Sequence, residues 1–148
     1  MKLASLNQAG RDGALIVVSR DLSRGVKVAH IAGTMQEAIE RWAQVEPLLK
    51  SVAAQLELGT VDNTFTVDPV LLASPFPRAF QFLDGSVYLH HMEKARKARG
   101  AEMPPNYKTE PLMYQGLSDR FIGPREPMLI TDETLGLDYE AELAVVVD

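Results

Sequence analysis

The sequence predicts an α+β fold, in which a small β-sheet with a packed helix is followed by a second, loop-rich region. Three short β-favouring runs, residues 2–6, 14–19 and 26–31, precede an apolar stripe at helical spacing over residues 39–56. Nine prolines and ten glycines among 148 residues are typical of a loop-rich protein. We expect the helix to pack on the sheet through its apolar stripe.

The first two β-favouring runs are predicted to form a hairpin. Gly10-Arg11-Asp12-Gly13 separates them, and an Asp-Gly pair favours a tight hairpin turn. The third run follows a polar turn at residues 20–25 and is expected to join the same sheet.

A helix is predicted to begin at Thr34, because Thr34 and Glu37 have the spacing of a capping box. Pro47 interrupts the apolar stripe, so we expect a kink, or two helices that meet near Glu46, with Gly59 at the end of the second. The stripe indicates a packing helix without chemistry of its own. Its residues are Ile39, Trp42, Val45, Leu49, Val52 and Leu56.

Ser74-Pro75-Phe76-Pro77 marks a boundary. We therefore place an N-terminal subdomain at residues 1–78 and a second domain at residues 79–148. In the second domain we expect a strand at 80–83, a turn at 84–86, a helix at 87–99 ended by Gly100, and irregular structure over 101–127.

Charge and composition exclude several classes of function. The net charge of −5 disfavours nucleic acid as a partner, and the absence of cysteine excludes disulfides and thiolate chemistry. No run approaches the roughly 18 apolar residues that a membrane span needs, and no signal peptide precedes the polar residues near the N-terminus. We expect a cytoplasmic protein without nucleic-acid or membrane partners.

Carboxylates alternate along the last predicted strand, residues 136–147. Asp138, Glu140 and Glu142 would share one face, about 7 Å apart from one to the next. A divalent cation with a preference for oxygen ligands, Mg²⁺ or Ca²⁺, could neutralise them. The alternative is an edge strand whose acidic face is exposed to water.

Other polar residues are candidates for a site. His90 and His91 are adjacent and point in different directions, so only one can readily serve a given site. Tyr114 and Gln115 could donate hydrogen bonds to a substrate from the predicted loop. The basic residues Lys94, Arg96, Lys97 and Arg99 fall at a helix C-terminus, where they either complement the helix dipole or bind an anion.

Taken together, these segments resemble the fumarylacetoacetate hydrolase family over essentially the whole chain. The residues that carry the resemblance are the N-terminal run 1–22, Lys97 to Pro104, Pro111 to Gly116, and Tyr139-Glu140-Ala141-Glu142-Leu143. The resemblance implies the first part of a mixed β-roll catalytic domain, a homodimer, and a Mg²⁺ or Ca²⁺ ion bound by Glu140 and Glu142.

The implied activity is hydrolysis of fumarylacetoacetate or a related diketo acid in aromatic amino-acid breakdown. His91 would activate water, Tyr114 and Gln115 would contact the substrate, and Arg99, or Arg96, would hold a substrate carboxylate. An isomerase or decarboxylase of the same fold is the near alternative. A non-catalytic structural or dimerisation module is the alternative from another class.

Two departures from the family pattern remain. Tyr88 to Glu93 contains no aspartate in the register of the metal-binding aspartate that precedes the family's catalytic histidine, so His91 could be a base or a metal ligand. The family's remaining metal-binding aspartate and its catalytic lysine lie beyond the Glu-x-Glu strand, and the sequence ends at Asp148. The resemblance therefore implies a fragment of a longer enzyme.

Overall fold

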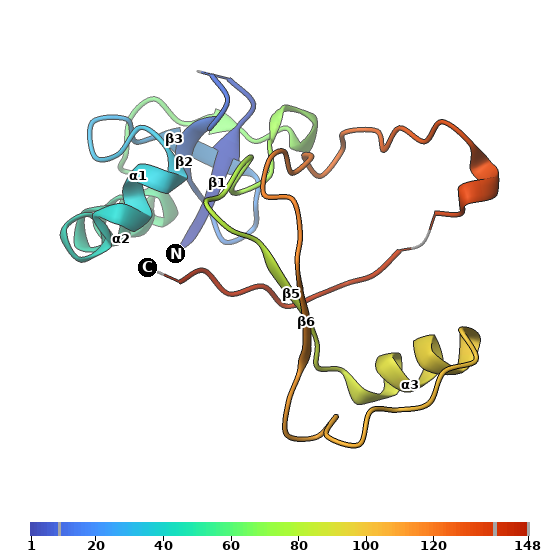
Figure 1. The fold of residues 1–148 in the computed structure, drawn as a ribbon. Helices are drawn as coiled ribbons and strands as arrows, with labels where there is room; N and C mark the ends of the chain where they lie inside the picture. The colour runs from blue at the N-terminus through green and yellow to red at the C-terminus, as the bar shows by residue number, and fades with distance from the viewer. Residues whose placement is uncertain (9, 138, 148) are drawn as a thin grey trace. The chain divides into compact units, whose positions relative to one another are not determined.

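The computed structural model describes residues 1–8, 10–137 and 139–147, and its fold class is α+β, as predicted. The chain divides into two compact units (Figure 1). One unit contains residues 1–78 together with 120–148, and the other contains residues 79–119.

The first unit is built on a four-stranded antiparallel sheet of β1 (Lys2–Leu6), β2 (Ala14–Val18), β3 (Arg24–Lys27) and β4 (Phe65–Thr66), in that order. The predicted hairpin is confirmed, because β1 pairs with β2 from Lys2 opposite Val18 to Leu6 opposite Ala14. Gly13 in the connecting turn has a φ of 69°, and a Cβ there would lie 2.7 Å from the Leu6 carbonyl oxygen. The turn therefore depends on glycine at this position.

The capping box is confirmed at the start of α1 (Met35–Glu40). The Thr34 hydroxyl accepts a hydrogen bond from the Glu37 amide at 3.1 Å, and the Glu37 carboxylate accepts one from the Gly33 amide at 2.7 Å. Gly59, with a φ of 71°, ends the second helix, α2 (Trp42–Leu58), as predicted.

The helix break predicted near Glu46 is wrong, since it falls at Arg41, between α1 and α2. Pro47 lies inside α2, where it removes the one hydrogen bond that its amide would donate to the carbonyl four residues back. Val45 and Leu49, on either side of Pro47, are both buried, so core packing outweighs that local cost.

The core of the first unit lies between the sheet and the helices, which cover one face of it (Figure 1). Leu15, Val17 and Val26 from the sheet pack with Val45, Leu49 and Leu56 of α2. The apolar stripe thus makes the contact expected of it.

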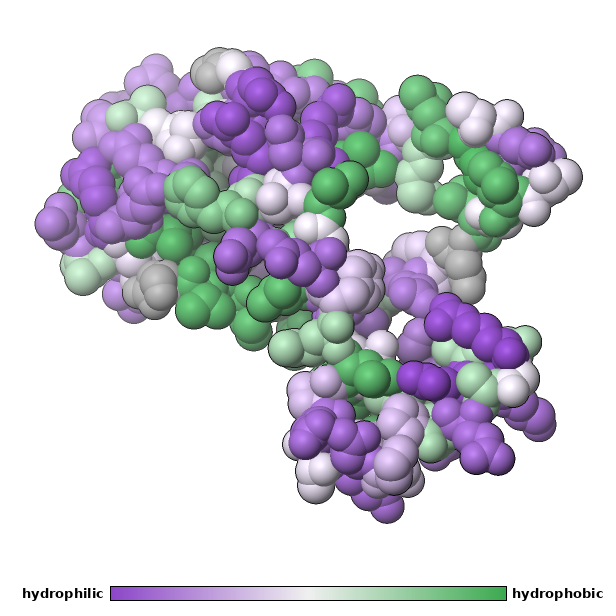
Figure 2. Space-filling model, in the orientation of Figure 1, coloured by the Kyte–Doolittle hydropathy of each residue, from purple (hydrophilic) through white to green (hydrophobic). Residues whose placement is uncertain are grey.

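The rest of the first unit has little regular structure. Its described residues include the short 3₁₀ helices η1 (Pro69–Leu71) and η2 (Glu133–Leu135). Apolar side chains around η2 are exposed, and Figure 2 shows them as green surface on this loop; they include Met128, Leu129, Leu135 and Leu137.

The second unit consists of β5 (Leu83–Ser86), α3 (Leu89–Ala98) and β6 (Leu112–Gln115), with β5 and β6 paired antiparallel. The helix confirms the prediction over 87–99, and Gly100 follows it with a φ of 65°. Three predictions here are wrong: the strand expected at residues 80–83 begins only at Leu83, residues 84–86 form a strand rather than a turn, and residues 112–115 form its partner rather than a loop. Each segment becomes a strand because the other supplies its hydrogen bonds.

Candidate active site

The antiparallel pair of β5 and β6 places two polar side chains directly opposite each other. Asp84 on β5 faces Tyr114 on β6, and Leu83 faces Gln115. Because directly opposed residues of an antiparallel pair project from the same face, the Asp84 carboxylate and the Tyr114 phenol share one surface. Asp84 is half-buried, whereas Tyr114 is 59% exposed. This surface offers an anionic acceptor beside a hydroxyl donor.

Sequence reasoning missed Asp84. The Asp84-Gly85-Ser86 triplet has the composition of a turn, and it was interpreted as one. One signal could have indicated Asp84: the segment that carries it leads directly into the helix with His90 and His91. A carboxylate at that position is a candidate partner for a histidine.

Gly116 ends β6 beside an aromatic ring. Its amide donates to the Phe82 carbonyl at 3.0 Å, and a Cβ on it would lie 2.6 Å from the Phe82 ring. A larger residue here would push the ring or the strand away. Gly116 thus fixes the strand end next to Gln115.

Helix α3 contacts β5 and carries both histidines in its first turn. Met92, 3% exposed, is the buried residue of the helix, while His90 and His91 both face solvent. The structure therefore places His91 on the helix that packs against the Asp84 strand.

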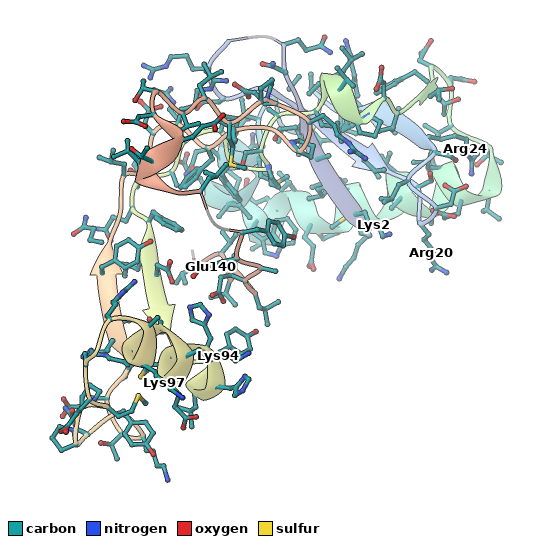
Figure 3. The ribbon with its side chains drawn as sticks, turned by 90° about the vertical axis from the view of Figure 1, so that its right-hand side faces the viewer. Lys2, Arg20, Arg24, Lys94, Lys97 and Glu140 are labelled. Atoms are coloured by element: carbon teal, nitrogen blue, oxygen red, sulfur yellow. The ribbon has the colours of Figure 1, made fainter. Side chains whose placement is uncertain are left out.

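The basic residues gather toward the C-terminal end of α3. Lys94 and Lys97 are one turn apart on this helix (Figure 3). Arg99 is the C-cap residue of α3. Its backbone amide donates a hydrogen bond to the Ala95 carbonyl at 3.2 Å, and its side chain is exposed. Cations here complement the negative end of the helix dipole, and the same positions suit an anionic ligand.

Glu140 and Glu142 are both exposed, and Glu140 lies on the C-terminal segment of the first unit (Figure 3). The predicted strand is wrong for residues 139–147, which belong to no strand, and Asp138 lies outside the described residues. A strand requires a partner for its backbone groups, and the β propensity of Ala-Val-Val-Val alone does not provide one.

The carboxylates match the ligand chemistry of a hard cation but form only part of a shell. Mg²⁺ and Ca²⁺ take six or more oxygen ligands. Within residues 1–8, 10–137 and 139–147, no three histidine, aspartate or glutamate side chains converge as a metal site would require. Glu140, Glu142 and Asp84 therefore remain individual candidate ligands.

Two protein-family profiles match the chain. Residues 1–78 match the family described as fumarylacetoacetase N-terminal domain 2, and residues 81–148 match that described as fumarylacetoacetate (FAA) hydrolase C-terminal. A search of curated proteins gave no match. Over the described residues, no helix has the length and apolar character needed to cross a membrane.

Proposed function

Because the chain belongs to the fumarylacetoacetate hydrolase family, we propose that it serves metal-dependent hydrolysis of a carbon–carbon bond in a small diketo acid. The proposed substrate is fumarylacetoacetate or a related acylpyruvate, and the products from fumarylacetoacetate are fumarate and acetoacetate. A cytoplasmic homodimer in aromatic amino-acid breakdown is the proposed setting. The observation that carries the proposal is the Asp84–Tyr114 pair on one face of β5 and β6, inside the region matched to the hydrolase domain.

The residues of β6 and of α3 have distinct proposed roles. The Tyr114 hydroxyl donates a hydrogen bond to a substrate oxygen, whereas Gln115, the next residue along β6, projects from the opposite face of the strand. His91 takes a proton from the attacking water, and Arg99 pairs with a substrate carboxylate. Water then adds to the carbonyl carbon, the carbon–carbon bond breaks, and the departing enolate is protonated to give the second acid.

Glu140 and Glu142 are the proposed metal ligands of this chain. Their oxygen chemistry suits Mg²⁺ or Ca²⁺. When bound, the ion supplies Lewis-acid stabilisation of the diketone oxygens. Removing one of these carboxylates is expected to weaken cation binding as well as turnover.

A non-catalytic structural module is the second candidate. It is favoured by the exposure of Glu140 and Glu142, and by the absence of a three-residue ligand group among the residues that the structure describes. Calorimetric titration with Mg²⁺ separates the two candidates. Micromolar binding that Glu140→Gln abolishes supports the enzyme, and no heat of binding supports the module.

The activity test supplies fumarylacetoacetate with Mg²⁺ and follows the loss of diketo absorbance. Tyr114→Phe is expected to lower kcat/KM by roughly 10²-fold, since it removes one donor to a charged oxygen. Glu133→Gln, on η2, is the matched control for Glu140→Gln and should leave turnover unchanged. No turnover by the full-length protein would refute the hydrolase, while a product that keeps all substrate carbons, or releases only CO₂, would indicate an isomerase or a decarboxylase.

A further inference from the structure

The segment that leaves the N-terminal sheet, residues 71–75, lies along the edge strand β1. The Ala73 amide donates to the Ser5 carbonyl at 2.9 Å, and the fully buried Ser5 hydroxyl donates to the Pro75 carbonyl at 2.7 Å. These bonds tie Ala73 and Pro75 to the sheet. The departing chain is therefore fixed rather than a free linker.

An ion pair fixes Arg78, three residues beyond this segment. The Arg78 Nε and Nη2 atoms donate to the two carboxylate oxygens of Asp12 at 2.5 and 2.8 Å, and this pairing holds the pKa of Asp12 below its usual range. Asp12 belongs to the turn between β1 and β2. The hairpin turn and the departing chain are thus joined through side chains.

Residues 120–126 return to this segment and dock on it. The Phe121 amide donates to the Pro77 carbonyl at 2.8 Å. Gly123 is buried, and a Cβ on it would collide with the Leu72 carbonyl oxygen. Only a residue without a side chain allows the two backbones to approach this closely.

The docked segment is braced internally by Glu126. Its carboxylate accepts a hydrogen bond from the Gly123 amide at 3.1 Å and pairs with the Arg120 guanidinium, and both interactions hold the pKa of Glu126 below its usual range. The brace shapes the turn that presents Gly123 to Leu72.

The clasp, residues 120–126, falls within the hydrolase-domain match yet packs on the N-terminal domain. We propose that through the clasp the N-terminal domain anchors the start of the segment that carries Glu140 and Glu142, and so acts as a positioning device for that segment. The clasp is inferred from the contacts of Phe121 and Gly123 alone. Its effect on metal binding by Glu140 and Glu142 rests on the proposed function.

Hydrogen exchange of the whole chain tests the clasp without reference to activity. Gly123→Ala is expected to lower the protection factor of the Phe121 amide by about 10-fold or more, while the amide of Val17, in the sheet core, keeps its protection. Gly85→Ala is the matched control, because a Cβ there meets only ordinary contacts, the nearest at 3.6 Å. It should leave Phe121 protected.

A second variant keeps the test decisive if Gly123→Ala unfolds the protein. Glu126→Gln adds no volume and removes the ion pair with Arg120, so it should lower protection at Phe121 with Val17 unaffected. Selective loss at Phe121 in either variant supports the clasp. Unchanged protection at Phe121 in both variants, or parallel loss at Phe121 and Val17 in both, would overturn it.

Discussion

Thr34 shows how one side chain determines where a helix begins. Its hydroxyl accepts the Glu37 amide, one of the donors left without a partner in the first turn of α1. Thr34→Ala should therefore lower the free energy of unfolding by about 1 kcal/mol. Urea denaturation followed by circular dichroism measures the change. Thr64→Ala, at an exposed loop position, is the control, and an equal loss in both variants would contradict the capping role.

Asp21 makes stability depend on pH at the turn between β2 and β3. Hydrogen bonds from the Ser19 hydroxyl, and then from the Ser23 amide and hydroxyl, lower the pKa of Asp21 from 3.8 to about 2. A carboxyl whose pKa is lowered by folding stabilises the protein above pH 3.8, and this contribution is lost as the pH falls toward about 2.

Asp21→Asn should therefore reduce the loss of stability on acidification. The measurement is the urea midpoint at about pH 5 and at about pH 2.5, an interval that covers most of the range over which the contribution of Asp21 is lost. Asp62→Asn, in the exposed loop after α2, should retain the full drop. If both variants lose as much stability as the unmodified protein, the Asp21 network does not stabilise the fold.

At the scale of elements, α2 is held by its buried stripe. Leu49 is 0% exposed and lies in the core cluster, whereas its neighbour Leu48 is 53% exposed. Leu49→Ala should cost about 2–5 kcal/mol because it leaves a cavity, and Leu48→Ala should change stability by less than about 0.5 kcal/mol. Urea unfolding of the two variants compares them directly. Equal effects would mean that α2 is not anchored through this stripe.

Elements set by short-range signals could be predicted from the sequence. The turn at Asp12-Gly13, the cap at Thr34 and the helix end at Gly59 each depend on groups only a few residues apart. The same local reasoning predicts a break beside Pro47 that does not occur. The cost of proline is a local signal, whereas the burial of Val45 and Leu49 that outweighs it depends on distant residues.

Elements that depend on a distant partner could not be predicted in this way. Asp84-Gly85 has turn composition, yet it becomes strand because Met113 and Tyr114 pair with it. Residues 139–147 show the converse, since strong β propensity yields no strand when none of the described residues pairs with them. For the candidate site, Tyr114 and Gln115 are predicted on a loop but lie on a strand, and Asp84 is not predicted as a candidate because its pairing with Tyr114 is long-range.

For the whole molecule, charge and core are distributed unequally along the chain. Residues 120–148 contain seven acidic and two basic side chains and so account for the entire net charge of −5, whereas residues 1–78 contain eight of each. In the described part of the chain, every buried core residue except Met92 lies between Leu6 and Leu56. The acidic end can attract cations, while the N-terminal domain supplies the stability.

This distribution predicts that residues 1–78 fold without the rest of the chain. The fragment retains the sheet, both helices and the Asp12–Arg78 pair, and its folding should appear as one cooperative urea transition with a slope of about 1 kcal/mol per molar. A fragment of residues 1–126 adds the clasp and should unfold at a higher urea concentration, because Phe121 and Gly123 then cover the departing segment. Both fragments should be measured at low protein concentration, since a fragment with no net charge tends to associate. A non-cooperative transition for residues 1–78 would show that the N-terminal core depends on the later residues, and equal midpoints would show that the clasp adds nothing to it.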